Sequence, residues 1–369
     1  MKKISLLKVN LPPKNILLKA LEHQFYEDGY IAEGNKVIEF ENKFGNYINN
    51  QNIISVNSGT SALHLALILA GVKPGDEVIS TPATSIATNQ AILISGAKIV
   101  WADVDPFTGN LYAESIEKKV NKKTKAIVVV HYGGIPAHLN PIIDIGRKYS
   151  IPIIEDAAHA LGALYENKKI GCHSDYIIFS FQAVKTMTTV DGGALVCKRV
   201  EDVKSGKIIR WFGIDKNFNK MDPKSGLDIA VVGYKYHMNN ITAVIGLTQM
   251  ERIEDTLKRY RENAEYYNSR LGDVPGITLC LPFYNCNPSY WLYTLRVEKR
   301  DEFIEYLNSK GIEASIVHPR NDTYSIFKEF KSYLPGVDEF YNSMVHIPVG
   351  WWLEKEDLEY IFETIRRGW

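Results

Sequence analysis

Short apolar runs alternate with amphipathic stretches through most of the first two hundred residues. The amphipathic stretches have the spacing of helices, and the apolar runs have the length of strands. Because strands that are apolar on both faces must be covered on both faces, this alternation predicts a mostly parallel central sheet between two layers of helices. The predicted fold class is therefore α/β, with three layers (α/β/α). The predicted strands are residues 53–56, 78–80, 98–104, 126–132, 151–154, 176–181 and 193–197.

The N-terminus and the part of the chain after residue 200 depart from this alternation. Residues 1–14 predict an extended arm, and residues 213–232 predict a polar surface loop. Toward the C-terminus the pattern becomes mixed, which predicts a smaller α+β domain. The expected units are an N-terminal arm and helix (1–30), a large domain (31–250) and a small C-terminal domain (251–369). Helices are expected near residues 15–24, 37–47, 240–271, 302–310 and 354–367, and strands near 294–297 and 313–318.

Composition narrows the class of protein. Lysine plus arginine and aspartate plus glutamate both number 43, so no basic surface favours a nucleic-acid partner. No apolar run is long enough to span a membrane, and the apolar stretch at the N-terminus is too short for a secretory signal. The four cysteines show neither CxxC pairing nor histidine clustering, which indicates reduced thiols and no metal site. We expect a soluble, cytoplasmic protein.

One lysine stands in unusual surroundings. In the stretch SDYIIFSFQAVKTMTTVDGGAL, residues 174–195, Lys185 follows an apolar strand and precedes hydroxyl residues and a Gly-Gly turn. Burial disfavours the charged form of a lysine and lowers its pKa. A neutral amine can attack a carbonyl and bond to it covalently. The alternative interpretation is an ordinary solvated loop lysine.

Two strand ends offer further chemistry, because ligands bind at the carboxyl ends of strands in an open parallel sheet. In NSGTSALHLAL, residues 57–67, a strand ends and a helix begins with Thr60 and Ser61 in its first turn. Free backbone N–H groups and hydroxyls at a helix N-terminus form a phosphate cradle. An ordinary helix cap would have the same residues and needs no ligand.

The second strand end is IPIIEDAAHALGA, residues 151–163, where Asp156 ends the strand and His159 follows it. A buried aspartate held against a protonated ring nitrogen keeps that nitrogen charged. A helix-capping aspartate and a structural histidine are the alternatives. Phosphate cradle, acidic strand end and desolvated Lys185, in this order on a parallel sheet, together suit an aromatic aldehyde that carries a phosphate and a pyridine nitrogen. Pyridoxal 5'-phosphate has all three features.

The chain resembles the sugar aminotransferases of the DegT/DnrJ/EryC1/StrS family, which are pyridoxal-phosphate enzymes with the aspartate-aminotransferase fold (type I). The matching segments run in the family's order from about residue 29 to the C-terminus. They include GYIAEGNKVIEFE, NSGTSALHLAL, KPGDEVIS, GAKIVWADVD, EDAAHALGA, SFQAVKTMTTVDGGAL, GYKYHMNNITAVIGLTQ and LEKEDLEYI.

The resemblance implies roles for individual residues. Lys185 would bond to the cofactor's aldehyde, Asp156 would pair with the pyridine nitrogen, and His159 would approach the 3-hydroxyl. Phosphate contacts are implied for Thr60, Ser61 and Ser180. The resemblance also implies a homodimer with shared sites, in which His237 stands where some relatives have an asparagine that reaches the partner's phosphate.

Two segments depart from the family pattern. Relatives place an aromatic residue over the pyridine ring where this chain has Ser85. The segment VHPRNDTYSIF also differs, although His318 and Arg320 remain candidate contacts for a phosphate or a donor carboxylate. An ordinary surface ion pair is the alternative for Arg320. Tyr290 and Trp291 are expected either in the substrate cleft or in the core.

The expected function is transfer of an amino group, with glutamate as donor, to the keto group of a nucleotide-linked deoxysugar in cell-surface polysaccharide or glycoconjugate biosynthesis. Lys185 argues against the family's deoxygenating branch, whose members have histidine at that position. The surrounding QAVKTMTT favours amination at C4 over C3. The alternatives are an aminotransferase for a small phosphorylated ketone or polyol and a cofactor-binding regulator without turnover.

Overall fold

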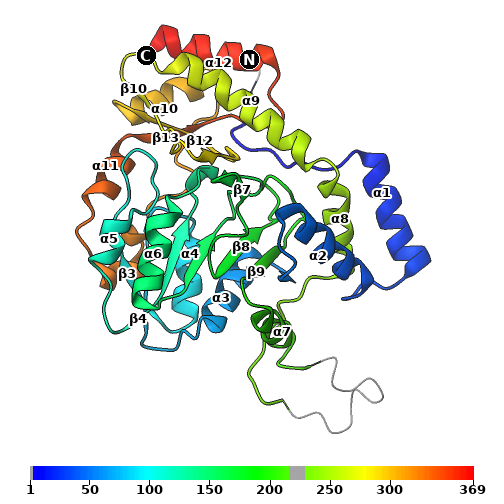
Figure 1. The fold of residues 1–369 in the computed structure, drawn as a ribbon. Helices are drawn as coiled ribbons and strands as arrows, with labels where there is room; N and C mark the ends of the chain where they lie inside the picture. Colours follow the sequence, from blue (N-terminus) through cyan, green and yellow to red (C-terminus); the bar gives the residue numbers. More distant parts are fainter. Residues whose placement is uncertain (1–2, 216–228) are drawn as a thin grey trace.

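The computed structural model describes residues 3–215 and 229–369. Its centre is a seven-stranded sheet of order β1-β9-β8-β5-β4-β2-β3, which Figure 1 shows between helices. The pairs β2–β3, β2–β4, β4–β5 and β5–β8 are parallel. The strands are β1 (Ile53–Val56), β2 (Glu77–Ser80), β3 (Lys98–Trp101), β4 (Thr124–Val130), β5 (Ile153–Asp156), β8 (Tyr176–Ser180) and β9 (Gly193–Cys197).

Apolar side chains fill both faces of this sheet, because both faces carry helices. One core joins the sheet to helices α2 (Asn35–Ile48), α6 (Leu139–Tyr149) and α8 (Asn240–Met250). The other core joins it to α3 (Gly59–Leu69), α4 (Ile86–Ile94) and α11 (Pro335–Ser343). The predicted three-layer α/β/α architecture with a mostly parallel sheet is confirmed. Two further helices beside the sheet are α5 (Ala113–Glu117) and α7 (Val200–Ile209).

A second sheet, with its own core, lies toward the C-terminus (Figure 1). Its order is β10-β12-β13, and both pairs are antiparallel. The extended N-terminal arm joins this part of the chain, because Ile4 bridges Ile312 and the backbone N–H of Leu6 donates to Glu313. Its elements are β10 (Ile277–Leu279), β12 (Tyr293–Val297), β13 (Met344–Ile347), α9 (Ile253–Leu271), α10 (Arg300–Ser309) and α12 (Lys355–Gly368).

Several predicted elements need correction. The helix expected from 240 to 271 is two helices, because Arg252 leaves the helical region (φ −118°, ψ 3°) and a new helix starts after it. Residues 313–318 form only an isolated bridge with β13, through Ser315, because side chains of Asn308 and His346 take backbone N–H groups that a strand partner would use. Strand β9 runs antiparallel to both neighbours.

The remaining elements lie at the N-terminus and in the loops. Helix α1 (Lys14–Glu22) continues into the π-helical turn η1 (His23–Asp28), which extends the predicted helix. Most of the loop predicted at 213–232 lies outside the described residues, and the domain boundaries at residues 30 and 250 stay a prediction. Within the described ranges, no helix is long and apolar enough to cross a membrane. The small elements are β6 (Leu164–Tyr165), β7 (Lys168–Lys169), β11 (Cys286–Asn287), η2 (Tyr132–Gly134), η3 (Asn321–Thr323) and η4 (Ser325–Phe330).

Candidate active site

A cavity of about 300 Å³ opens at the carboxyl ends of the parallel strands. Its position follows from the topology, because β5 and β8 are parallel neighbours and end side by side. Polar and apolar groups both line it. The lining residues are Leu7, Ser58, Gly59, Thr60, Leu63, Thr84, Ser85, Ala87, Val130, Asp156, Ala158, His159, Ile178, Ser180, Gln182, Val184, Lys185, Asp191, Gly192, Trp291, Val317 and His318.

Lys185 lies in the loop between β8 and β9, and its side chain enters this cavity. Its backbone N–H donates to the carbonyl of Gln182 at 2.9 Å. The Nζ atom lies 3.7 Å from the centre of the Trp291 ring. Burial lowers the pKa of Lys185 to about 7, although the negative charge of Asp156 acts in the opposite direction. The structure therefore gives this amine the partly neutral character that the sequence predicts.

Asp156 is fixed in the cavity wall by two donors. Thr88 Oγ1 donates to Oδ2 at 2.7 Å, and the backbone N–H of Ala158 donates to Oδ1 at 3.1 Å. The neighbouring Glu155 points to the opposite face of the strand, where Oε2 contacts His131 Nε2 at 2.9 Å. Of the two adjacent carboxylates, only that of Asp156 therefore faces a ligand.

Three aromatic rings form a layered group beside the lysine. The rings of His159 and Trp291 are stacked with centroids 4.1 Å apart, and those of His159 and His318 are stacked with centroids 5.1 Å apart. Burial and the charge of Lys185 hold the pKa of His159 well below its usual range and lower that of His318 to about 3. Both imidazoles are therefore neutral. Their Nε2 atoms lie 3.3 Å apart, so one of them donates and the other accepts.

The N-terminus of α3 forms another part of the cavity wall. Ser58 caps the helix, because its Oγ accepts from the backbone N–H of Ser61. Gly59 is needed for close approach, since a Cβ there would lie 2.9 Å from Cβ of Ser180. This packing places the first turn of α3 beside the Ser180 hydroxyl and leaves backbone N–H groups and the Thr60 hydroxyl for an anion.

The structure brings most of the predicted site residues together in the cavity and leaves four outside its lining. Ser61 Oγ donates to Asn57, and Tyr290 packs in the C-terminal core. His237 forms an isolated β-bridge with Val56, and the centroid of its ring lies 4.1 Å from that of Trp211. Arg320 donates to both oxygens of Asp322 and also pairs with Asp338. The residues that do line it are Thr60, Ser85, Asp156, His159, Ser180, Lys185 and His318.

Sequence reasoning missed Thr88 as a contributor to this site and left Trp291 open between the substrate cleft and the core. Thr88 lies 68 residues before the carboxylate that it holds, and Trp291 lies 107 residues after the carbonyl that it binds. Neither belongs to the strand ends on which the prediction rested. The available signal was weak: Trp291 follows Tyr290, and a buried aromatic pair is as typical of a core as of a cleft.

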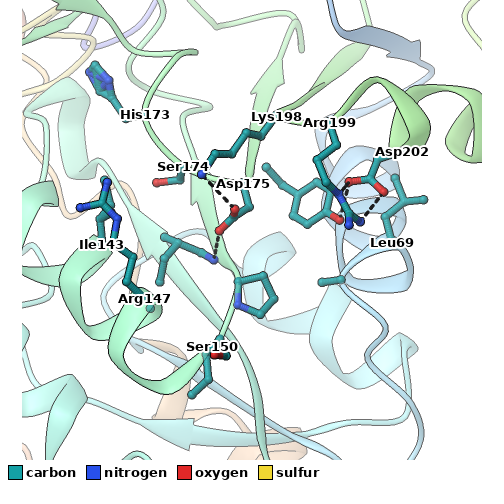
Figure 2. Close-up of a pocket in the computed structure, with 16 residues that line it drawn as sticks. Leu69, Ile143, Arg147, Ser150, His173, Ser174, Asp175, Lys198, Arg199 and Asp202 are labelled. Carbon is teal, nitrogen blue, oxygen red and sulfur yellow. Dashed lines mark hydrogen bonds and ion pairs between the residues drawn. The ribbon is translucent and has the colours of Figure 1, made fainter.

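A second cavity of about 340 Å³ lies at the amino ends of β5 and β8, away from Lys185. Figure 2 shows both carboxylates of its lining paired with neighbouring cations. Asp175 accepts from the backbone N–H of Ile153 and pairs with Lys198, and Asp202 pairs with Arg199 at 2.7 Å. These pairs leave little charge for a ligand, so the chemistry of the chain points to the first cavity.

The first cavity fits pyridoxal 5'-phosphate. His159 Nδ1 is buried and has no hydrogen-bond partner among the described residues, so it is ready for a polar ligand atom. The α3 N-terminus suits a phosphate, the fixed carboxylate of Asp156 suits a protonated ring nitrogen, and the amine of Lys185 suits an aldehyde. Ser85 caps α4 and presents no ring to the cavity, so the aromatic cover that relatives have is missing at this position.

Comparisons with known proteins agree with this chemistry. Residues 17–366 match the sequence model of the DegT/DnrJ/EryC1/StrS aminotransferase family. GDP-perosamine synthase of Caulobacter vibrioides is 35% identical over 78% of this chain and 77% of its own. The sugar aminotransferase CalS13 of Micromonospora echinospora superposes with a TM-score of 0.95, at 36% identity over 99% of this chain and 100% of its own. The PLP form of a putative sugar aminotransferase, Spr1654 of Streptococcus pneumoniae, superposes with a TM-score of 0.90, at 25% identity over 99% and 98%.

Proposed function

The chain belongs to the DegT/DnrJ/EryC1/StrS family of PLP-dependent aminotransferases, and from this premise we propose that it aminates the keto group of a nucleotide-linked deoxysugar. The donor in this proposal is glutamate and the position is C4. The observation that carries the proposal is the joint placement of Lys185, Asp156 and the α3 N-terminus around one cavity. The similarity to GDP-perosamine synthase supports a nucleotide-linked acceptor.

Bound pyridoxal 5'-phosphate supplies an aldehyde and an electron-accepting ring. Lys185 Nζ would hold that aldehyde, and as a free amine it would accept and return a proton at the reacting carbon. A pKa of about 7 suits this exchange, because the amine is then present in both forms near neutral pH. Asp156, held by Thr88, would keep the ring nitrogen protonated.

The histidines orient the other edge of the ring. His159 Nδ1 would donate to the 3-oxygen, and its neutral ring is stacked on Trp291 and contacts His318 through Nε2. Thr60, Ser180 and the N–H groups of the α3 N-terminus would bind the phosphate. His318, beside His159, would contact the substrate. The pairing of Arg320 with two carboxylates removes the support for a substrate contact by that residue.

We further propose that the active form is a homodimer with shared sites. Lys185 is the only lysine or arginine among the described lining residues, while a phosphate and a donor carboxylate both bring negative charge. A second copy, with the segment around His237, would supply further contacts to the phosphate. Apolar side chains on and after α1 are exposed, Tyr26 by 86%, and a second copy would cover them. A solution mass of one chain, 41.8 kDa, would contradict this assignment.

Covalent labelling tests the central assignment. Borohydride treatment of the protein with pyridoxal 5'-phosphate should fix the cofactor on the peptide that contains Lys185, and label on another lysine refutes the proposal. Lys185→Ala should reduce transamination by at least about 1,000-fold while the fold is retained. Acceptors should be compared side by side, as nucleotide-linked 4-keto sugars, 3-keto sugars and small phosphorylated ketones. Conversion of the bound cofactor to its amine form by glutamate indicates an enzyme, and failure of this conversion favours a cofactor-binding regulator without turnover.

A further inference from the structure

Trp291 contacts both Lys185 and His159, although it lies in the C-terminal part of the chain. Its side chain is 2% exposed. The indole Nε1–H donates to the carbonyl of Val184, the residue before the lysine, at 2.8 Å. The Lys185 Nζ atom lies 3.7 Å from the ring centre, and the ring of His159 is stacked on the indole. One side chain therefore contacts the lysine loop, the lysine amine and the histidine.

The backbone around Trp291 is held just as firmly. Ser289 Oγ donates to the carbonyl of His159 at 2.8 Å, and its backbone N–H donates to the carbonyl of Gly134 at 3.1 Å. Gly134 has φ +94°, and a Cβ there would lie 2.5 Å from Ser289 Oγ and 3.0 Å from the backbone N of Trp291. The glycine thus permits the close approach of this segment to η2, and the segment in turn fixes both the backbone and the ring of His159.

We propose that Trp291 is a positioning residue for the amino-transfer reaction, which sets the place of Lys185 through the Val184 carbonyl and the place of His159 through ring stacking. The face of the indole stabilises the protonated amine by a cation–π contact, and its bulk excludes water from the amine. This inference rests on the proposed role of Lys185 as the cofactor-bonding residue.

Two variants separate the contacts. Trp291→Phe keeps an aromatic face but removes the donor to Val184, and Trp291→Leu removes both. Trp101→Phe is the matched control, because Trp101 is equally buried, lies outside the cavity and has no hydrogen-bond partner for Nε1 among the described residues. The full-length, cofactor-free protein is examined by hydrogen exchange, and titration with pyridoxal 5'-phosphate gives the equilibrium constant of the bond to Lys185.

We expect the peptide over residues 182–188 to exchange about fivefold faster in both Trp291 variants, because one hydrogen bond to the loop is lost. The equilibrium constant for bond formation should fall about fivefold in Trp291→Phe, which loses the hydrogen bond to the loop, and about twentyfold in Trp291→Leu, which also loses the ring that places His159. Trp101→Phe should stay within about twofold of the wild type in both measurements.

Equal behaviour of the Trp291 variants and Trp101→Phe overturns the inference, as does exchange that rises across the whole chain without a local excess at 182–188. The position of the borohydride-fixed label in the wild type distinguishes failure of the proposed function from failure of the positioning role. Label at Lys185 together with unchanged Trp291 variants rejects only the positioning role. Label elsewhere rejects the proposed function, while the exchange measurement still reports on the contact between Trp291 and the loop.

Discussion

The lowered pKa of Lys185 makes the stability of the cofactor-free protein depend on pH in a definite direction. The perturbation is Lys185→Met, which keeps a flexible side chain of similar length against Trp291 but removes the amine. The folded pKa is about 7, against an ordinary value of 10.5. One pKa unit corresponds to about 1.4 kcal/mol, so the full shift would correspond to about 5 kcal/mol. Because Lys185 is partly exposed, we expect about 2–5 kcal/mol.

The sign follows from proton binding. Between pH 7 and 10.5 the unfolded lysine holds a proton that the folded one has released, so the free energy of unfolding of the wild type rises with pH in this window. Below pH 7 both states are protonated and the folded state carries the whole cost of burying the charge. Lys185→Met should therefore be more stable than the wild type at pH 6, and the difference should shrink steadily toward pH 10.

Urea unfolding of both proteins without cofactor, at half-unit steps from pH 6 to 10, measures this difference. The difference between the two proteins cancels the titration of groups that they share, apart from histidines coupled to the lysine. Lys258→Met, at an exposed position on α9, is the matched control and should give a flat difference. Parallel pH profiles for the wild type and Lys185→Met would show that the amine is not desolvated in the fold and would refute the reasoning.

Two further predictions concern the scaffold and the assembly. Arg210→Met should lower the free energy of unfolding by about 3–5 kcal/mol in urea titrations, because it removes the buried cation that pairs with the buried carboxylate of Glu41 and the partly buried one of Glu33. A loss below about 1 kcal/mol would contradict a stabilising network. Burial alone would raise the pKa of Glu41, but the charges of Arg210 and Lys207 hold it below its usual value in the wild type. Tyr26→Lys should shift the sedimenting mass toward one chain at micromolar concentration, and an unchanged dimer would place the interface away from η1.

The positions of the strands were predictable from the sequence, because the burial of apolar side chains determines them. Strands apolar on both faces could lie only inside a covered sheet, and the structure has them at nearly the expected residues. Direction was not predictable for β9, because its apolar run GALVC packs equally well in either orientation. The break near Arg252 was missed for a similar reason, since helix-forming residues continue across it.

Local spacing in the sequence indicated the residues that come together from neighbouring strand ends, namely Asp156, His159 and Lys185. It indicated Trp291 only as a residue of either the cleft or the core, and it did not indicate Thr88, because both reach the site through long-range packing. Arg320 illustrates a different limit. Its chemistry suits a carboxylate, but Asp322 two residues later already supplies one. That neighbour was visible in the sequence and favoured the structural interpretation.

The surroundings of Lys185 contain two opposing effects whose sizes can be compared. A cation–π contact with the Trp291 ring favours the ammonium form, by about 0.5–2 kcal/mol. Desolvation favours the neutral form, and the pKa of about 7 shows a net preference of up to about 5 kcal/mol relative to water. Desolvation therefore exceeds the attraction of both the ring and Asp156. The result is an amine that loses its proton near neutral pH while a partly charged state remains accessible, which is what a group that must both bond to a carbonyl and return a proton requires.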